Sequence, residues 1–311
     1  MSHTIAFLGL PKSGKTTWLG RLWLAIDRPS LDQVQLLQKA GQPDLDALNA
    51  LADPFIDAKY PAPTPFKNPP RIRAPLKWTG RKDEPFFDVV IADYSGEEVK
   101  AIHKERDPAW STAWEERAQA ANVAIFIRPE HHIRPTSTRL VKERMLTHVS
   151  QAGQVGKSPL RDSEGGNLDG WLVVPTAVAI VELLQFFRFL RGWAPGWTPE
   201  PSEFRVAVML SCWDAVPEHE RAGGPAAYMR ERLGLLDDFL ATNFKPEGVR
   251  AFGISSTGGD LTNDEFKDTY LQKYPEDWGA VAWNDRKGVQ ESVDLALPLA
   301  WLLVGEEALP K

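Results

Sequence analysis

Short apolar runs alternate with helical patterns along the chain. The runs at 86–92 and 122–127 are nearly continuous in apolar residues, as in strands buried on both faces of a sheet. Apolar positions at helical spacing separate most of the runs, first at 16–26. The predicted strands are 4–10, 71–78, 86–92, 122–127, 204–210 and 249–254. This alternation predicts an α/β fold of three layers, with helices on both faces of a mostly parallel sheet and ligands at the carboxyl ends of its strands.

Three stretches depart from this alternation. Residues 60–70 hold five prolines in eleven positions, which predicts an extended loop. The stretch 129–203 is too long for one connecting helix, and we interpret it as an inserted helical region packed on a single domain that spans 1–311. Its apolar pattern at 176–192 is more typical of a buried helix than of a partner-binding surface. The pattern at 290–304 predicts a closing helix, kinked or broken early at Pro298.

Composition and charge narrow the class of protein. The 311 residues carry 36 Lys plus Arg against 42 Asp plus Glu, a net charge of −6, so no basic footprint for nucleic acid is expected. The single cysteine, Cys212, can form neither an internal disulfide nor a multi-cysteine zinc site. The first residues lack the pattern of a signal peptide, and no apolar run is long enough for a membrane span. We therefore expect a cytoplasmic protein.

A complete phosphate-binding signature lies between the first predicted strand and the first predicted helix. Gly9-Leu10-Pro11-Lys12-Ser13-Gly14-Lys15-Thr16 matches G-x-x-x-x-G-K-[ST]. Its glycines let consecutive backbone N–H groups face a phosphate at the positive end of a helix. Lys15 is placed to neutralise the β- and γ-phosphates and Thr16 to offer its hydroxyl to Mg²⁺, although Pro11 lacks one N–H donor. The predicted nucleotide-binding residues here are Gly9, Pro11, Lys12, Ser13, Gly14, Lys15, Thr16 and Thr17.

Asp93-Tyr94-Ser95-Gly96 follows the buried strand at 86–92, and with the phosphate signature it resembles P-loop GTPases of the translation-factor and Ras-like class. The resemblance implies that Asp93 reaches Mg²⁺ through water and that the Gly96 amide contacts the γ-phosphate. Glu97 stands where many relatives carry a Gln that orients the attacking water, so Lys15, Gly96 and Glu97 are the implied catalytic residues. Thr64, in the proline-rich loop, fits the threonine that completes the Mg²⁺ shell, with Thr79 as the alternative.

Base recognition is the least regular part of the resemblance. The family's [NT]-K-x-D is replaced by Ser211-Cys212-Trp213-Asp214 after the strand at 204–210. Asp214 can accept hydrogen bonds from guanine N1–H and N2–H₂, for which adenine has no matching pair. Cys212 replaces the lysine that lies along the base and braces the loop, so Trp213 is a candidate to stack on the purine instead. Ser255 and Ser256 resemble the last family motif, in which a backbone amide and a small hydroxyl residue meet guanine O6.

The narrower resemblance is to bacterial double-GTPase-type families, which are associated with multi-gene conflict or defence systems. It implies a Mg²⁺-dependent GTP-binding protein, a slow GTPase that acts as a switch with protein partners. An ATP-binding P-loop protein is the first alternative, because position 212 lacks the lysine. The second is an interaction scaffold that binds nucleotide without hydrolysing it, which Glu97 and Pro11 favour. Regulator, effector, oligomeric state and pathway are left open by the sequence.

Overall fold

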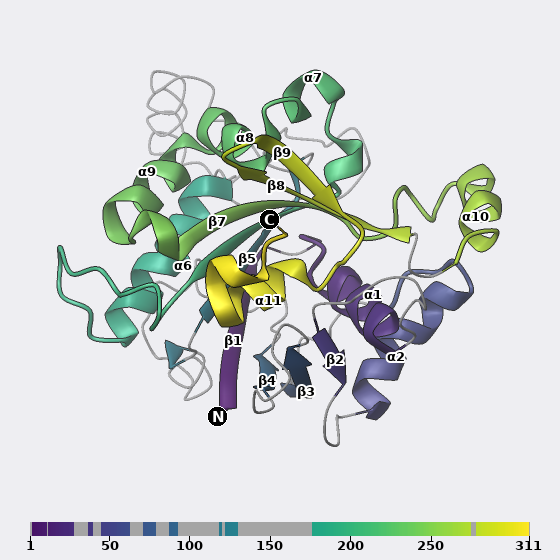
Figure 1. Cartoon of the computed structure of the whole chain (residues 1–311), viewed down its shortest axis with the longest axis horizontal. Helices are drawn as coiled ribbons and strands as arrows, with labels where there is room; N and C mark the ends of the chain where they lie inside the picture. Colours follow the sequence, from purple (N-terminus) through teal and green to yellow (C-terminus); the bar gives the residue numbers. More distant parts are fainter. Residues whose placement is uncertain are drawn as a thin grey trace, which may run out of the picture.

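The computed structural model of the chain describes residues 2–10, 12–27, 37–39, 45–62, 71–78, 87–92, 118–119, 122–129, 176–274 and 278–310. Within these residues, nine strands form one sheet in the order β2-β3-β4-β1-β5-β6-β7-β8-β9 (Figure 1). The strands are β1 (Ser2–Gly9), β2 (Leu37–Lys39), β3 (Arg71–Trp78), β4 (Phe87–Ala92), β5 (Asn122–Ile127), β6 (Val206–Ser211), β7 (Val249–Ser255), β8 (Ala280–Asp285) and β9 (Gly288–Ser292).

The middle of the sheet is parallel and its two edges are antiparallel. Strands β4, β1, β5, β6 and β7 pair in parallel with one another, in this order. The pairs β2–β3 and β3–β4 on one side, and β7–β8 and β8–β9 on the other, are antiparallel. All the parallel strands therefore end at the same side of the sheet, where an open α/β fold binds its ligands.

Helices lie on both faces of the sheet. In the described part of the chain they are α1 (Lys15–Asp27), α2 (Leu45–Ile56), α6 (Thr176–Leu190), α7 (Glu218–Arg221), α8 (Gly224–Arg232), α9 (Gly234–Asn243), α10 (Asp264–Leu271) and α11 (Leu297–Val304), with short 3₁₀ turns η2 (Trp213–Ala215), η3 (Pro246–Gly248) and η5 (Gly305–Ala308). Ile5 and Phe7 of β1 share one buried cluster with residues of α1, α2 and α11. Ala6 and Leu8 share the second cluster with residues of α6, α8 and α9. The strand alternation thus supplies both cores of the predicted three-layer fold.

The predicted strands are confirmed, with small shifts at their ends, whereas the closing helix is wrong in its first half. Strands β3 and β5 have the predicted bounds 71–78 and 122–127. The predicted helix at 290–304 is divided instead between the end of β9 and α11. Pro298 lies in the first turn of α11, where a missing N–H costs nothing because the first helical N–H groups have no partner within the helix.

Helix α6 is buried core structure, as its apolar pattern indicated. Its residues Ile180, Leu183, Leu184 and Phe187 pack in the cluster on the α6 face of the sheet. The helix lies between the parallel neighbours β5 and β6 in the chain, so it is the crossover that such a pair needs. Residues 130–175 lie outside the described part of the chain, so the inserted helical region within 129–203 stays a prediction.

Candidate nucleotide-binding site

Three predicted motifs meet at the carboxyl ends of neighbouring strands. The phosphate loop follows β1, Asp214 follows β6, and Ser255 is the last residue of β7. Strands β1, β5, β6 and β7 are consecutive in the sheet. The phosphate loop precedes Asp214 by about two hundred residues in the sequence, and the parallel sheet brings the three motifs to one edge.

Two glycines let the phosphate loop pass close to its neighbours. A Cβ on Gly9 would lie 2.6 Å from the carbonyl oxygen of Phe126, which is backbone and cannot move aside cheaply. Gly14 has φ +88°, a region that favours glycine, and a Cβ there would lie 2.9 Å from Cβ of Ser211. The loop therefore needs glycine at both signature positions.

Lys15 begins α1, and its side chain turns back over the loop. Its ammonium Nζ donates to the carbonyl oxygens of Gly9 at 3.2 Å and Leu10 at 3.3 Å, and lies 3.4 Å from Oγ of Ser13. The residue is only 7% exposed. The buried ammonium places a positive charge beside the loop, where a phosphate could form charge-assisted hydrogen bonds, which are stronger than those between neutral groups.

The remaining residues of the loop differ in exposure. Lys12 is exposed, Ser13 is buried, and Thr16 and Thr17 are half-buried in the first turn of α1. The backbone N–H groups of a first helical turn have no acceptor within the helix, so they suit a phosphate. Pro11 lies outside the described residues.

Ser211 joins the phosphate loop to the base side of the site, and the site prediction omitted it. Its Oγ lies 2.8 Å from the carbonyl oxygen of Ser13 and 3.3 Å from that of Ile127. The hydroxyl therefore fixes the end of β6 against the phosphate loop and β5. Its position as the first residue of Ser211-Cys212-Trp213-Asp214 was the signal that could have identified it.

Asp214 and Ser255 form the contact that defines the other end of the site. The Ser255 hydroxyl donates to Oδ1 of Asp214 at 2.6 Å. Ser255 is buried and Asp214 is exposed. The buried hydroxyl therefore fixes one carboxylate oxygen of a side chain that otherwise faces solvent. Cys212 enables this placement with a left-handed backbone, φ 51° and ψ 42°, just before turn η2.

Trp213 does not occupy the place expected of a base-stacking residue. Its side chain is 4% exposed and belongs to the buried cluster on the α6 face. The ring packs so closely on Gly253 that a Cβ there would lie 2.5 Å from the indole, and Tyr228 contacts it edge-on at 5.6 Å between ring centroids. The expected stacking of Trp213 on the purine is therefore corrected: the indole is packed in the core under η2 and is not accessible to a base.

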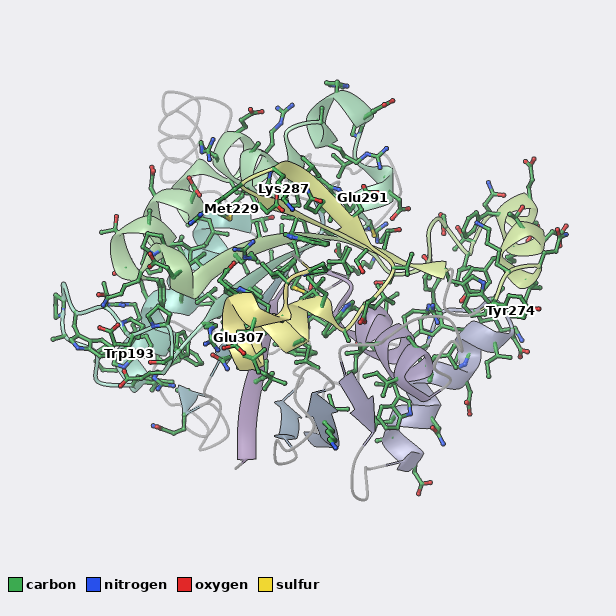
Figure 2. The ribbon with its side chains drawn as sticks, viewed as in Figure 1. Trp193, Met229, Tyr274, Lys287, Glu291 and Glu307 are labelled. Carbon is green, nitrogen blue, oxygen red and sulfur yellow. The ribbon has the colours of Figure 1, made fainter. Side chains whose placement is uncertain are left out.

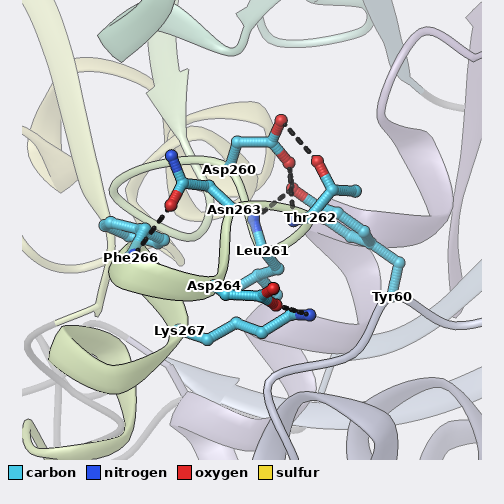
Figure 3. A network of polar contacts seen from close by, with 8 residues as sticks. All are labelled: Tyr60, Asp260, Leu261, Thr262, Asn263, Asp264, Phe266 and Lys267. Atoms are coloured by element: carbon cyan, nitrogen blue, oxygen red, sulfur yellow. Dashed lines mark hydrogen bonds and ion pairs between the residues drawn. The ribbon is translucent and has the colours of Figure 1, made fainter.

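The loop after Ser255 contacts the segment after α2 through Tyr60 (Figure 3). The hydroxyl of Tyr60 accepts a hydrogen bond from the Leu261 N–H at 3.2 Å and lies 3.3 Å from Oδ1 of Asp260. Partial burial raises the pKa of Tyr60, and the neighbouring Asp260 charge acts in the same direction. The hydrogen bond from the Thr262 N–H lowers the pKa of Asp260, and the charge of Arg128 adds to this effect.

The other predicted site residues lie outside the described part of the chain. They are Thr64, Asp93, Gly96 and Glu97. Thr16 is thus the described member of the predicted Mg²⁺ set, and a hydroxyl in the first helical turn beside a buried lysine is an oxygen ligand that suits Mg²⁺. Among the described residues, no group of three or more His, Cys, Asp or Glu side chains could hold a metal by itself. In the same residues, no helix is long and apolar enough to cross a membrane.

The parallel sheet, the glycine-dependent loop and the buried Lys15 define a nucleotide-binding α/β protein of the P-loop class. Within that class, the sequence model of the Double-GTPase 1 family matches residues 6–302. The chain therefore belongs to the Double-GTPase 1 family and is a GTP-binding protein. A search among curated proteins finds no match to it.

Proposed function

We propose that this protein is a Mg²⁺-dependent GTPase that hydrolyses GTP slowly and acts as a nucleotide-dependent switch. The observation that carries the choice of base is the 2.6 Å hydrogen bond from Ser255 to Asp214, beside a phosphate loop tied to the same strand end by Ser211. A carboxylate oriented in this way accepts from both guanine N1–H and N2–H₂. Adenine would leave the Asp214 carboxylate without these two donors, which costs binding free energy.

The proposed roles follow the two ends of the site. Lys15 and the N–H groups of the loop bind the β- and γ-phosphates, and Ser255 with the amide of Ser256 holds the base beside Asp214. Thr16, Thr64 and Asp93 would hold Mg²⁺, which when bound neutralises phosphate charge. Gly96 would contact the γ-phosphate. Glu97 orients water less well than a glutamine does, because a carboxylate has no N–H donor, and slow turnover follows.

Particular residues favour two alternative functions. Cys212, in place of a lysine, favours a protein that binds ATP at the same loop. Glu97 and Pro11 favour a scaffold that binds nucleotide without hydrolysing it. The family resemblance favours a bacterial, cytoplasmic switch that works with protein partners in a multi-protein defence or conflict system.

Nucleotide protection against thermal unfolding tests the choice of base. With Mg²⁺ present, we expect GDP to raise the melting temperature more than ADP does at the same concentration, because only GDP satisfies Asp214. Lys15→Ala is the control, and it should lose protection by both nucleotides while its own melting temperature stays near the wild-type value. Equal protection by ADP and GDP would favour the ATP-binding rival.

Hydrolysis separates the switch from the scaffold. Single-turnover measurements with purified protein and radiolabelled GTP should give slow release of phosphate. Protein that binds GTP with the expected preference but releases no phosphate, alone or with the products of neighbouring genes, would favour the scaffold.

A further inference from the structure

Arg21 is a buried cation that connects the phosphate helix to the base-side loop. It lies on α1, six residues after Lys15, and is 1% exposed. Its guanidinium Nε donates to the carbonyl oxygen of Ser256 at 3.1 Å. Because a peptide group is planar, a fixed Ser256 carbonyl also fixes the direction of the Thr257 N–H, next to the residues assigned to the base.

Aromatic rings hold the guanidinium in this place. Its central carbon lies 4.8 Å from the ring centroid of Trp278 and 5.8 Å from that of Phe55. Trp278 stacks in turn on Tyr270 at 3.8 Å and donates its indole N–H to the Tyr270 carbonyl oxygen at 2.7 Å. Burial lowers the pKa of Arg21 to about 10, so the side chain remains charged at neutral pH.

Tyr60 holds the other end of the same loop. Its ring lies edge-on to that of Phe55, with 6.4 Å between the ring centroids. Its hydroxyl accepts a hydrogen bond from the Leu261 N–H (Figure 3). Phe55 therefore touches both side chains that reach the loop. The loop between them begins at Ser255 and Ser256, the residues assigned to the base.

The two contacts come from elements that pack against each other, α1 and α2. Arg21 and Tyr60 reach the loop from α1 and from the end of α2, on the side of the sheet that carries the phosphate helix.

We propose that Arg21 and Tyr60 are positioning residues that hold the loop 255–261 in the conformation that binds the nucleotide base. The inference rests on the proposed function of this site. It predicts that removing either brace weakens the part of the affinity that comes from the base and spares the part that comes from the phosphates.

The experiment compares a ligand that has a base with one that has none. Dissociation constants for GDP and for inorganic tripolyphosphate, both with Mg²⁺, are measured by calorimetry on the full chain. In Arg21→Met we expect GDP to bind about tenfold more weakly, a loss of about 1.4 kcal/mol, while tripolyphosphate affinity stays within about twofold. Arg21→Lys keeps the charge without the planar fork, so it should recover part of the loss.

Arg188 supplies a matched control. It is also a buried arginine, 7% exposed, with its guanidinium near the rings of Trp193 and Phe244 and with main-chain carbonyl acceptors at Asn243 and Trp197. Trp193 lies at the opposite end of the molecule from α10 and Tyr274 (Figure 2). Arg188→Met should lower stability without changing the ratio of the two dissociation constants.

Tyr60→Phe tests the bracing role even if Arg21→Met does not fold, because it removes one hydroxyl and keeps the ring against Phe55. We expect it to weaken GDP binding about threefold to fivefold, again without an effect on tripolyphosphate. An unchanged ratio in both variants, or in Tyr60→Phe alone when Arg21→Met does not fold, overturns the bracing role. A wild-type chain that binds tripolyphosphate but shows no preference for GDP over ADP would instead contradict the proposed function.

Discussion

At the scale of single residues, three neighbours set the position of the Asp214 side chain. Ser255 fixes one carboxylate oxygen, the left-handed Cys212 starts the turn, and Trp213 anchors that turn in the core. Cys212 and Trp213 support Asp214 from within the protein, whereas Ser255 is also one of the residues proposed to hold the base. Their combined effect is to leave the second carboxylate oxygen of an exposed side chain with a fixed direction.

Asp214→Asn should change the base preference from guanine toward xanthine. An amide can donate to the xanthine 2-oxo group, whereas the carboxylate accepts from the guanine 2-amino group. We expect GDP affinity to fall by about 1–3 kcal/mol and xanthosine diphosphate to become the preferred ligand in competition binding. Asp238→Asn, an exposed substitution on α9, is the control and should leave both affinities unchanged. An unchanged preference in Asp214→Asn would place base recognition elsewhere.

The burial of Trp213 shows why the role of a single residue could not be predicted from the sequence. A tryptophan beside the motif aspartate is compatible with stacking on a base and with packing beneath the turn. Gly253 decides between them, since only a residue without a side chain on β7 leaves room for the indole. That glycine is 40 positions away, so no local pattern connects the two. Arg21 was recognisable only as a lone charge among apolar residues of a helix.

Helix α1 serves several parts of the site at the scale of elements. Its first turn carries Lys15 and Thr16, its core face packs Trp18 and Leu22 on the sheet, and Arg21 reaches the base-side loop. Helix α2 packs against α1 and ends at the segment that carries Tyr60. A change in the phosphate site can therefore be transmitted to the segment before the proline-rich loop through two packed helices.

Hydrogen exchange should detect this transmission if Thr64 closes over the γ-phosphate. The N–H groups of Asp57, Ala58 and Lys59 already bond to carbonyls of Pro54 and Phe55 at the end of α2. We expect residues 55–60 to exchange more slowly with a GTP analogue than with GDP, because a loop held by the γ-phosphate is released on its loss. Residues 94–98, which lie outside the described part of the chain, should also exchange more slowly with the GTP analogue. Equal exchange in both states, with occupancy confirmed, would reject the switch.

The central strands and β3 were predictable, and the outermost strands were not. Each strand of the parallel centre is an apolar run with its own turn signal, so β1 and β4 to β7 follow from the sequence. The three-residue β2 and the largely exposed β9 resemble loops in the sequence. Strand β8 is as long as the central strands β5 and β6, but its apolar run is short and ends in the polar Asn284 and Asp285. The stretch at 290–296 was assigned to a helix because the strong apolar pattern of α11 was extended too far toward the N-terminus.

Both halves of the site belong to one structure at the scale of the whole molecule. Strand β1 contributes Ile5 and Phe7 to one buried cluster and Ala6 and Leu8 to the other. Strands β6 and β7, which carry the base side, lie in the same sheet as β1. Neither the phosphate loop nor the base-side loop can lose its support without disturbing strands that both clusters share.

The chain should therefore unfold in a single cooperative transition that GDP shifts as a whole. Buried tryptophans report from distant elements: Trp23 on α1, Trp283 on β8 and Trp301 on α11. We expect the urea midpoints from tryptophan fluorescence and from far-ultraviolet circular dichroism to coincide. GDP at 100 times its dissociation constant should add about 2.7 kcal/mol to the free energy of unfolding without changing the slope. Two separate transitions, of which GDP shifts one, would replace the single domain over 1–311 with two.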